Sequence, residues 1–148
     1  MIKQSIVTAA LLLMALVARA DVVDIDSAQL ARLVASGVAV VDIRTAPEWK
    51  ETGVIAGSKL FTFIDEKGRI DVTNWLGKVR LAAKPGEPVI LICRSGNRSK
   101  AATQLLSEKA GYKVVYNAGG GMNAWIKEGK PVVSPSSALV GCVAGAPC

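Results

Sequence analysis

The sequence predicts an α/β fold built on a mainly parallel, five-stranded sheet flanked by helices. Short apolar stretches alternate with longer stretches whose apolar residues recur at helical spacing, which is typical of βαβ units. The almost unbroken apolar runs at 38–43 and 89–92 indicate strands buried on both faces, as in parallel sheets. With 148 residues, 51% of them hydrophobic, the chain is long enough for one packed domain, which we place at 21–133.

The first half of this domain is expected to contain three strands. They are predicted at 22–25, 38–43 and 58–63. Ser27 is the expected cap of a helix between the first two strands, and Gly37 ends this helix. Pro47 then predicts a short helix through Thr52, because proline is favoured in a first helical turn.

The second half continues the alternation with two strands and three helices. The strands are predicted at 89–92 and 113–116, and the helices at 75–83, 99–110 and 122–127. Pro85 breaks the first of these helices, and Gly111 ends the second. The three glycines at 119–121 form a turn before the last helix, so the domain ends in a helical segment.

The first twenty residues have the features of a secretory signal peptide. A basic start at Lys3 precedes an apolar run at 6–17, and Ala18 and Ala20 supply the small residues of a cleavage site. The run of about 12 apolar residues is shorter than the roughly 20 that span a bilayer. We therefore expect cleavage after Ala20, export to a bacterial periplasm, and no stable membrane anchor afterwards.

The three cysteines are expected to have different roles in an oxidising compartment. Residues 134–148 read as a flexible tail, and within it Cys142 and Cys148 are the natural candidates for a disulfide. This pairing leaves Cys93 as the odd, reactive thiol. As an alternative, a tail cysteine reaches Cys93 and accepts or resolves its sulfur.

The segment from Cys93 to Ser99 carries the clearest chemical signal. Cys93 follows an apolar strand and precedes a helix, so backbone N–H groups and a helix N-terminus can be directed at its sulfur. Both favour negative charge, and the thiolate is the nucleophilic form of cysteine. The predicted substrate-binding residues are Arg94, Ser95, Gly96, Asn97, Arg98 and Ser99. In this group the arginines supply charge for an anionic substrate, while Gly96 and Asn97 supply left-handed backbone.

The composition excludes several classes of site. The chain has no histidine, so no Cys–His dyad, Ser–His–Asp triad or His-ligated metal site can form within it. The three cysteines do not have metal-ligand spacing, and we assign neither a metal nor a cofactor. The net charge of +6 suits small anionic substrates, but no basic stripe with aromatic residues indicates a nucleic-acid partner.

Several segments together resemble the rhodanese family in the right order. They are 41–44 with 47–49, 53–58, 93–99, and 116–120 with Trp125. The resemblance runs from about residue 26 to residue 132 and does not include the tail from Ser134. One departure is that Val54 and Ala56 stand where the family usually has His and Pro. Because catalysis in this family depends on the cysteine loop, we interpret this departure as structural.

This resemblance implies a three-layer fold and a sulfurtransferase. Sulfane sulfur would pass from thiosulfate or a similar donor, through a persulfide on Cys93, to cyanide or a thiol. Independently of the resemblance, Asp42 and Arg44 lie at the end of a buried strand, so we expect them to form a fold-stabilising ion pair or backbone contacts and not to touch substrate. Glu48 is expected to be a surface residue. One alternative is a cysteine-loop phosphatase or arsenate reductase, but those enzymes have five residues between Cys and Arg, and only four separate Cys93 from Arg98. The other alternative is a non-catalytic persulfide or redox binding module.

Overall fold

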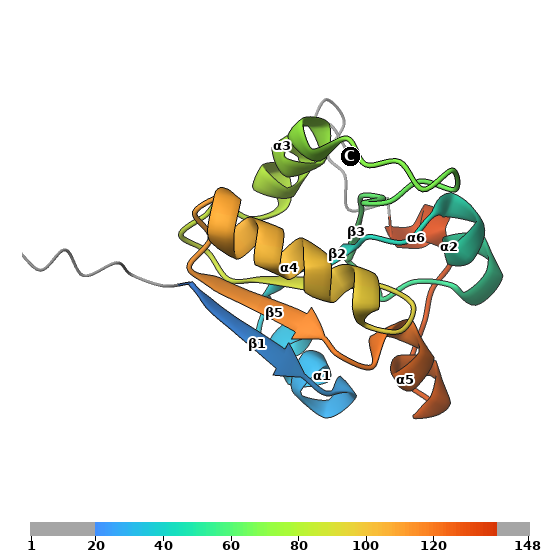
Figure 1. The fold of residues 1–148 in the computed structure, drawn as a ribbon. Helices are drawn as coiled ribbons and strands as arrows, with labels where there is room; N and C mark the ends of the chain where they lie inside the picture. Colours follow the sequence, from blue (N-terminus) through green and yellow to red (C-terminus); the bar gives the residue numbers. More distant parts are fainter. Residues whose placement is uncertain (1–19, 139–148) are drawn as a thin grey trace, which may run out of the picture.

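The structure, a computed structural model, describes residues 20–138 as strands and helices in alternation (Figure 1). The elements are β1 (Asp21–Ile25), α1 (Ser27–Ala35), β2 (Ala39–Asp42), α2 (Ala46–Thr52), β3 (Lys59–Leu60), α3 (Val72–Ala82), β4 (Val89–Ile92), α4 (Asn97–Lys109), β5 (Val114–Ala118), α5 (Gly121–Lys127) and α6 (Pro135–Ala138). The predicted signal segment up to residue 19, Cys142 and Cys148 lie outside the described residues.

The five strands form one sheet in the order β1-β5-β4-β2-β3, and all neighbouring strands are parallel. This confirms the predicted α/β class and its parallel sheet. The central strand β4 is fully buried, as its apolar sequence predicts. Because the strands are parallel, the segments that follow them meet at one edge of the sheet, where ligand sites of such folds lie. Cys93 follows β4 at the centre of this edge.

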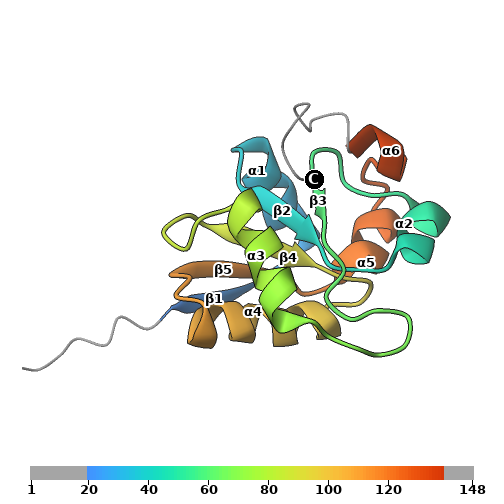
Figure 2. The same cartoon turned by 90° about the horizontal axis from the view of Figure 1, so that it is seen from above.

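Two apolar clusters hold helices against opposite faces of the sheet, giving three layers (Figures 1 and 2). Trp75 of α3 and Leu106 of α4 pack with Leu91 on one face. Leu30 of α1 and Trp125 of α5 pack with Ile90 and Ile92 on the other face. The period of two along β4 explains this division, since successive side chains point to opposite faces.

Helix starts differ from the sequence prediction where an aspartate precedes the expected first residue. The Asp26 carboxylate accepts a hydrogen bond from the Gln29 N–H at 2.7 Å, so Asp26, and not Ser27, caps α1. The Asp71 carboxylate accepts from the Asn74 N–H at 3.1 Å and starts α3 earlier than the predicted residue 75. In both cases a carboxylate satisfies a backbone donor of the first turn.

The third strand is shorter than predicted: 58–63 has strand-like residues, but only Lys59–Leu60 forms β3. This strand lies at the edge of the sheet and pairs with β2 alone. The Phe61 and Phe63 N–H groups still donate to the Asp42 and Ile43 carbonyls at 3.1 and 3.0 Å, and both aromatic side chains are buried. The apolar pattern of 58–63 therefore predicts the burial of the aromatic side chains correctly, although only two of these residues have strand geometry.

A backbone bridge ties the end of the described chain to the loop after α2. Val54 and Val133 form an isolated antiparallel bridge, with an N–H donating to a carbonyl in each direction at 2.9 Å. The short helix α6 follows this bridge and was not predicted. Among residues 20–138, no helix is long and apolar enough to cross a membrane.

Candidate active site

Cys93 lies directly after the central strand, with only 1% of its surface exposed. Its side chain belongs to the apolar cluster beneath α3 and α4. Its carbonyl accepts a hydrogen bond from the Met122 N–H at 2.9 Å, and the Arg94 carbonyl accepts from the Asn123 N–H at 3.0 Å. The first turn of α5 therefore holds the backbone on which the sulfur is mounted.

Three polar groups surround the Cys93 sulfur. The N–H groups of Gly96 and Ser99 donate to Sγ at 3.1 and 3.4 Å, and the Ser99 Oγ lies 3.3 Å from it. The sulfur is also next to the N-terminus of α4, whose dipole favours negative charge. The structure thus brings two donors of the predicted cradle, Gly96 and Ser99, onto the sulfur.

The Ser99 hydroxyl serves two acceptors. Its Oγ lies 3.2 Å from the Gly96 carbonyl as well as 3.3 Å from the sulfur. When Cys93 is a thiol, the S–H can donate to Oγ while the hydroxyl donates to the carbonyl. When Cys93 is a thiolate, the hydroxyl can turn and donate to the sulfur. Ser99 is fully buried, so no water competes for this proton.

Glycine is required at two positions where the cysteine loop meets the turn at 119–121. Gly96 has a φ of +95°, and a Cβ there would overlap the Gly119 carbonyl. Gly121 has a φ of +58°, and a Cβ there would overlap the Arg94 carbonyl. The three-glycine turn therefore allows two backbone segments to touch. The expectation that Asn97 is left-handed is wrong, since no described non-glycine residue has a positive φ and Asn97 is the first residue of α4.

Arg98 is held by Glu48 of α2 in a two-pronged ion pair. Its Nη1 donates to Oε2 at 2.9 Å and its Nη2 donates to Oε1 at 2.6 Å. The hydrogen bonds from Arg98, with its charge, lower the pKa of Glu48 to about 2 against the opposing effect of burial. The hydrogen bond to Glu48 likewise raises the pKa of Arg98, with smaller contributions from the charges of Glu48 and Cys93. The expectation that Glu48 is a plain surface residue is therefore wrong.

Asp42 and Arg44 form the predicted buried ion pair. The Arg44 Nη2 lies 2.6 Å from the Asp42 carboxylate, and both side chains are 1% exposed. The same guanidinium donates to the Thr52 hydroxyl at 2.7 Å and to the Gly53 carbonyl at 2.9 Å. The end of α2 is thereby tied to the end of β2, which places Glu48 opposite Arg98.

The remaining predicted site residues are exposed on the rim of the loop. They are Arg94, Ser95 and Asn97. Arg94 lines a small cavity of about 50 Å³ together with Glu48, Glu51 and Asn123. Within residues 20–138, Arg94 makes no ion pair, so it is the arginine of the loop that is available to an anion.

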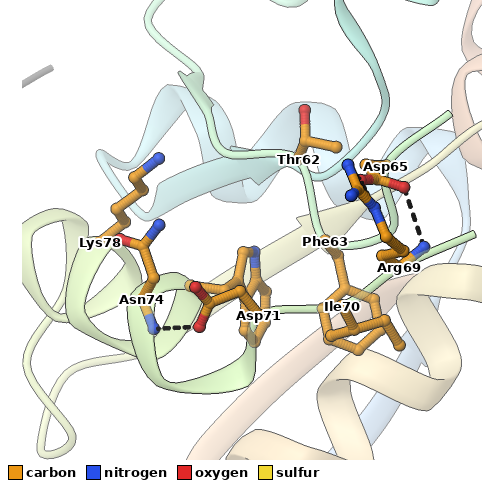
Figure 3. A pocket seen from close by; sticks show the side chains of 9 residues that line it. Thr62, Phe63, Asp65, Arg69, Ile70, Asp71, Asn74 and Lys78 are labelled. Carbon is orange, nitrogen blue, oxygen red and sulfur yellow. Dashed lines mark hydrogen bonds and ion pairs between the residues drawn. The ribbon is translucent and has the colours of Figure 1, made fainter. Parts of the chain in front are cut away.

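A larger cavity of about 420 Å³ is lined by the segment between β3 and α3 and by residues of α3 itself (Figure 3). Cys93 does not line it. Arg69 is paired with Asp65 at 2.8 Å on one side of it, and Asp71 caps α3 on the other. Phe63 and Trp75, whose ring centroids are 4.7 Å apart, also line this cavity. Three of its charged side chains, Asp65, Arg69 and Asp71, are thus already engaged in an ion pair or a helix cap. No cluster of three or more His, Cys, Asp or Glu in the described part of the chain is arranged for a metal ion.

Two features of the site were missed from the sequence. Glu48 lies fifty residues before Arg98, and only the tertiary structure brings the two side chains together. A signal was present, because a cation in the first turn of a helix opposes the helix dipole and calls for a compensating anion. The backbone N–H groups of Met122 and Asn123 could not be found from side-chain patterns.

Comparison with known proteins places these features in context. The sequence model of the family described as "Rhodanese-like domain" matches residues 26–128. The chain is 33% identical over 117 residues to thiosulfate sulfurtransferase 18 of Arabidopsis thaliana, covering 76% of this chain and 84% of that protein. It is 33% identical over 115 residues to a sulfurtransferase of Allochromatium vinosum, covering 76% and 95%. A rhodanese-related protein of Thermoplasma volcanium superposes with a TM-score of 0.58 at 30% identity, over 75% of this chain and 97% of that one.

Proposed function

The chain belongs to the rhodanese-like domain family, and from this premise we propose that it is a thiosulfate sulfurtransferase-like enzyme that works through a persulfide on Cys93. The observation that carries the proposal is the set of three polar groups around one buried sulfur at the N-terminus of α4. These groups suit a sulfur that alternates between thiolate and persulfide.

The first half-reaction consumes the donor. The Cys93 thiolate attacks the outer sulfur of thiosulfate, a new S–S bond forms, and the S–S bond of the donor breaks. Sulfite leaves with the electron pair, and the enzyme keeps a persulfide anion. Arg94, on the rim and without an ion pair among the described residues, is the group suited to hold the sulfonate end of the donor.

The second half-reaction regenerates the enzyme. Cyanide, or a thiolate, attacks the outer sulfur of the persulfide, and thiocyanate or a new persulfide leaves. The Cys93 thiolate that is released regains hydrogen bonds from the Gly96 and Ser99 N–H groups. With an anionic acceptor neither step moves a proton to or from carbon or water, so the lack of histidine does not obstruct the cycle.

The geometry weighs against a phosphatase. A phosphoryl site needs an arginine whose guanidinium contacts the transferred oxygens. Arg98 comes one residue too early in the loop for this role, and both of its outer nitrogens are engaged by Glu48. The loop also carries no acidic residue to protonate a leaving group.

Intact mass measurement tests the proposal. The protein is incubated with thiosulfate, separated from small molecules and weighed, in parallel with Cys93→Ser. We expect one added sulfur atom on the wild type, its loss on treatment with cyanide, and no addition on the variant. Hydrolysis of an aryl phosphate without any sulfur adduct would contradict the proposal. An adduct that passes to no acceptor would favour the binding module.

We further propose that the chain is exported and cleaved, as its first twenty residues predict. Expressed in a bacterium, the periplasmic fraction is expected to contain a form whose N-terminal residue is Asp21. Its mass before and after reduction tests the pairing of Cys142 with Cys148, because reducing one disulfide adds two hydrogen atoms. A protein that retains Met1 in the cytoplasm would contradict the export.

A further inference from the structure

The two arginines of the cysteine loop differ in their surroundings. Arg98 is neutralised by Glu48 through two short hydrogen bonds, with side-chain exposures of 26% and 18% for the arginine and the glutamate. Arg94 has no ion pair among residues 20–138, and it shares its small cavity with Glu48 and Glu51. Glu48 therefore lies both against Arg98, as its ion-pair partner, and in the cavity that Arg94 lines.

This balance matters for the charge of the donor. Because the pKa of Glu48 is lowered to about 2, its carboxylate is ionised at every physiological pH. The nearby Asp42 is in turn paired with Arg44 and adds little net charge. Of the two loop arginines, Arg94 is thus the one that Glu48 does not offset. By offsetting the charge of Arg98, Glu48 removes twice as much attraction from a donor with two negative charges as from a donor with one.

We propose that Glu48 is a specificity-determining residue that disfavours doubly charged donors, and that the site is built for sulfane-sulfur donors with one negative charge, such as alkanethiosulfonates. This inference rests on the proposed sulfurtransferase function. With such a donor, the Cys93 thiolate attacks the outer sulfur, the S–S bond of the donor breaks, and an alkanesulfinate with one negative charge leaves. Thiosulfate instead releases sulfite, which carries two.

Glu48 acts here through charge and through Arg98, so its effect must be separated from a change in the reactivity of Cys93. Both donors react with the same sulfur, and both yield the same persulfide. The ratio of their kcat/KM values therefore cancels any change in the nucleophile and retains the effect of donor charge.

The test compares thiosulfate with methanethiosulfonate at saturating cyanide, with thiocyanate as the common product and the uncatalysed rate subtracted. In Glu48→Gln we expect the preference for methanethiosulfonate over thiosulfate to fall by about three- to tenfold, as one partly screened charge near the site predicts. Glu108→Gln is the matched control. It removes the same charge from the exposed far end of α4, about 15 Å along the helix from Arg98, and it is expected to leave the ratio unchanged.

Two more variants test whether the change in donor preference comes from charge and not from a loss of structure. Arg98→Gln leaves Glu48 unneutralised, so the preference for methanethiosulfonate should exceed that of the wild type. The double variant Glu48→Gln/Arg98→Gln restores a neutral pair, and its ratio should return to the wild-type value. Loss of packing would lower both rates alike and would not follow this order of charge.

The possible failures are distinguishable. If the wild type produces no thiocyanate from either donor, the proposed function itself is wrong. If it turns over both donors but the ratio is the same in the three variants, or changes against the order of charge, the role of Glu48 is wrong and the sulfurtransferase stands. Should Glu48→Gln not fold, Arg98→Gln and the double variant still decide the order.

Discussion

At the scale of single residues, the site is a sulfur with its donors already in place. Gly96 and Ser99 present backbone N–H groups, and the Ser99 hydroxyl can serve either the sulfur or the Gly96 carbonyl. The loop residues with exposed side chains, Arg94 among them, make no hydrogen bond to the sulfur in the described structure. The hydrogen bonds to the sulfur thus come from buried residues, and in the proposed reaction the exposed residues are the ones left to contact the donor.

Ser99→Ala tests the hydroxyl. The substitution keeps the backbone N–H bond to the sulfur and removes the donor that lies 3.3 Å from it. Since a hydrogen bond to a charged group contributes about 1.5–3 kcal/mol, persulfide formation should slow about ten- to a hundredfold. Rapid mixing with thiosulfate, followed by mass analysis of quenched samples, measures the rate.

Ser107→Ala is the matched control for this change. It lies on the same helix and makes no hydrogen bond of its own through its hydroxyl in the described structure. Its rate should equal that of the wild type. An unchanged rate in Ser99→Ala would mean that the hydroxyl serves only the Gly96 carbonyl.

At the scale of elements, the site is assembled from helix ends. The start of α4 carries the cradle, the start of α5 holds the backbone of Cys93 and Arg94, and α2 supplies Glu48. The turn at 119–121 makes this possible, because its backbone comes close to the cysteine loop at two points. Gly119 lies against Gly96, and Gly121 lies against Arg94. The order of elements along the chain thus follows from the sequence, while the site depends on contacts between their ends.

Gly121→Ala tests the close approach of the turn to the loop. The added Cβ would overlap the Arg94 carbonyl and would also strain a backbone with a φ of +58°. We expect a loss of unfolding free energy of about 2–4 kcal/mol, measured by urea denaturation, together with slower persulfide formation.

Gly129→Ala separates strain from overlap. Gly129 has a similar φ of +69°, but no atom lies within 4 Å of its added Cβ. Only the left-handed backbone then carries a cost, which should be about 1–2 kcal/mol. Equal losses in the two variants would show that the contact with the loop adds nothing.

At the scale of the whole molecule, two ion pairs join elements at the edge of the sheet where Cys93 lies. Asp42–Arg44 lies buried beneath it and ties the end of α2 to β2. Glu48–Arg98 spans fifty residues of sequence and joins α2 to α4. Ion pairs of this kind couple the stability of the fold to the ionisation of the side chains that form them.

The Glu48–Arg98 pair predicts a dependence of stability on pH. The pKa of Glu48 is about 2 in the folded protein and 4.5 when unperturbed, so its contribution is complete above about pH 4.5 and is lost as the pH falls toward 2. Allowing for solvent screening, we expect wild type to lose roughly 1–2 kcal/mol of unfolding free energy from this group over that range. Urea denaturation at several pH values measures the loss.

Glu48→Gln provides the comparison, because it cannot titrate. The pKa of Asp65 is also lowered, by hydrogen bonds from the Arg69 backbone and side chain, and this effect remains in the variant. The difference between wild type and variant therefore isolates Glu48. Parallel curves for the two proteins below pH 4.5 would contradict the coupling.

The sequence by itself determined the fold class, the buried strands and the position of Cys93. An apolar run such as 89–92 can only be satisfied by burial, and a cysteine directly after it, before a polar loop and a helix, has few other placements. Edge positions were less predictable. The residues of 58–63 bury their aromatic side chains, yet only two of them form a regular strand.

Tertiary structure alone decided which groups meet at the edge of the sheet where Cys93 lies. The pairing of Glu48 with Arg98, and the backbone donors of Met122 and Asn123, join segments that are 50 and about 30 residues apart. Such contacts depend on how helices pack across the sheet, and the spacing of residues along the sequence does not predict that packing. The periodic burial of side chains is a local property, so the sequence could predict the layers of this protein but not the charge balance of its site.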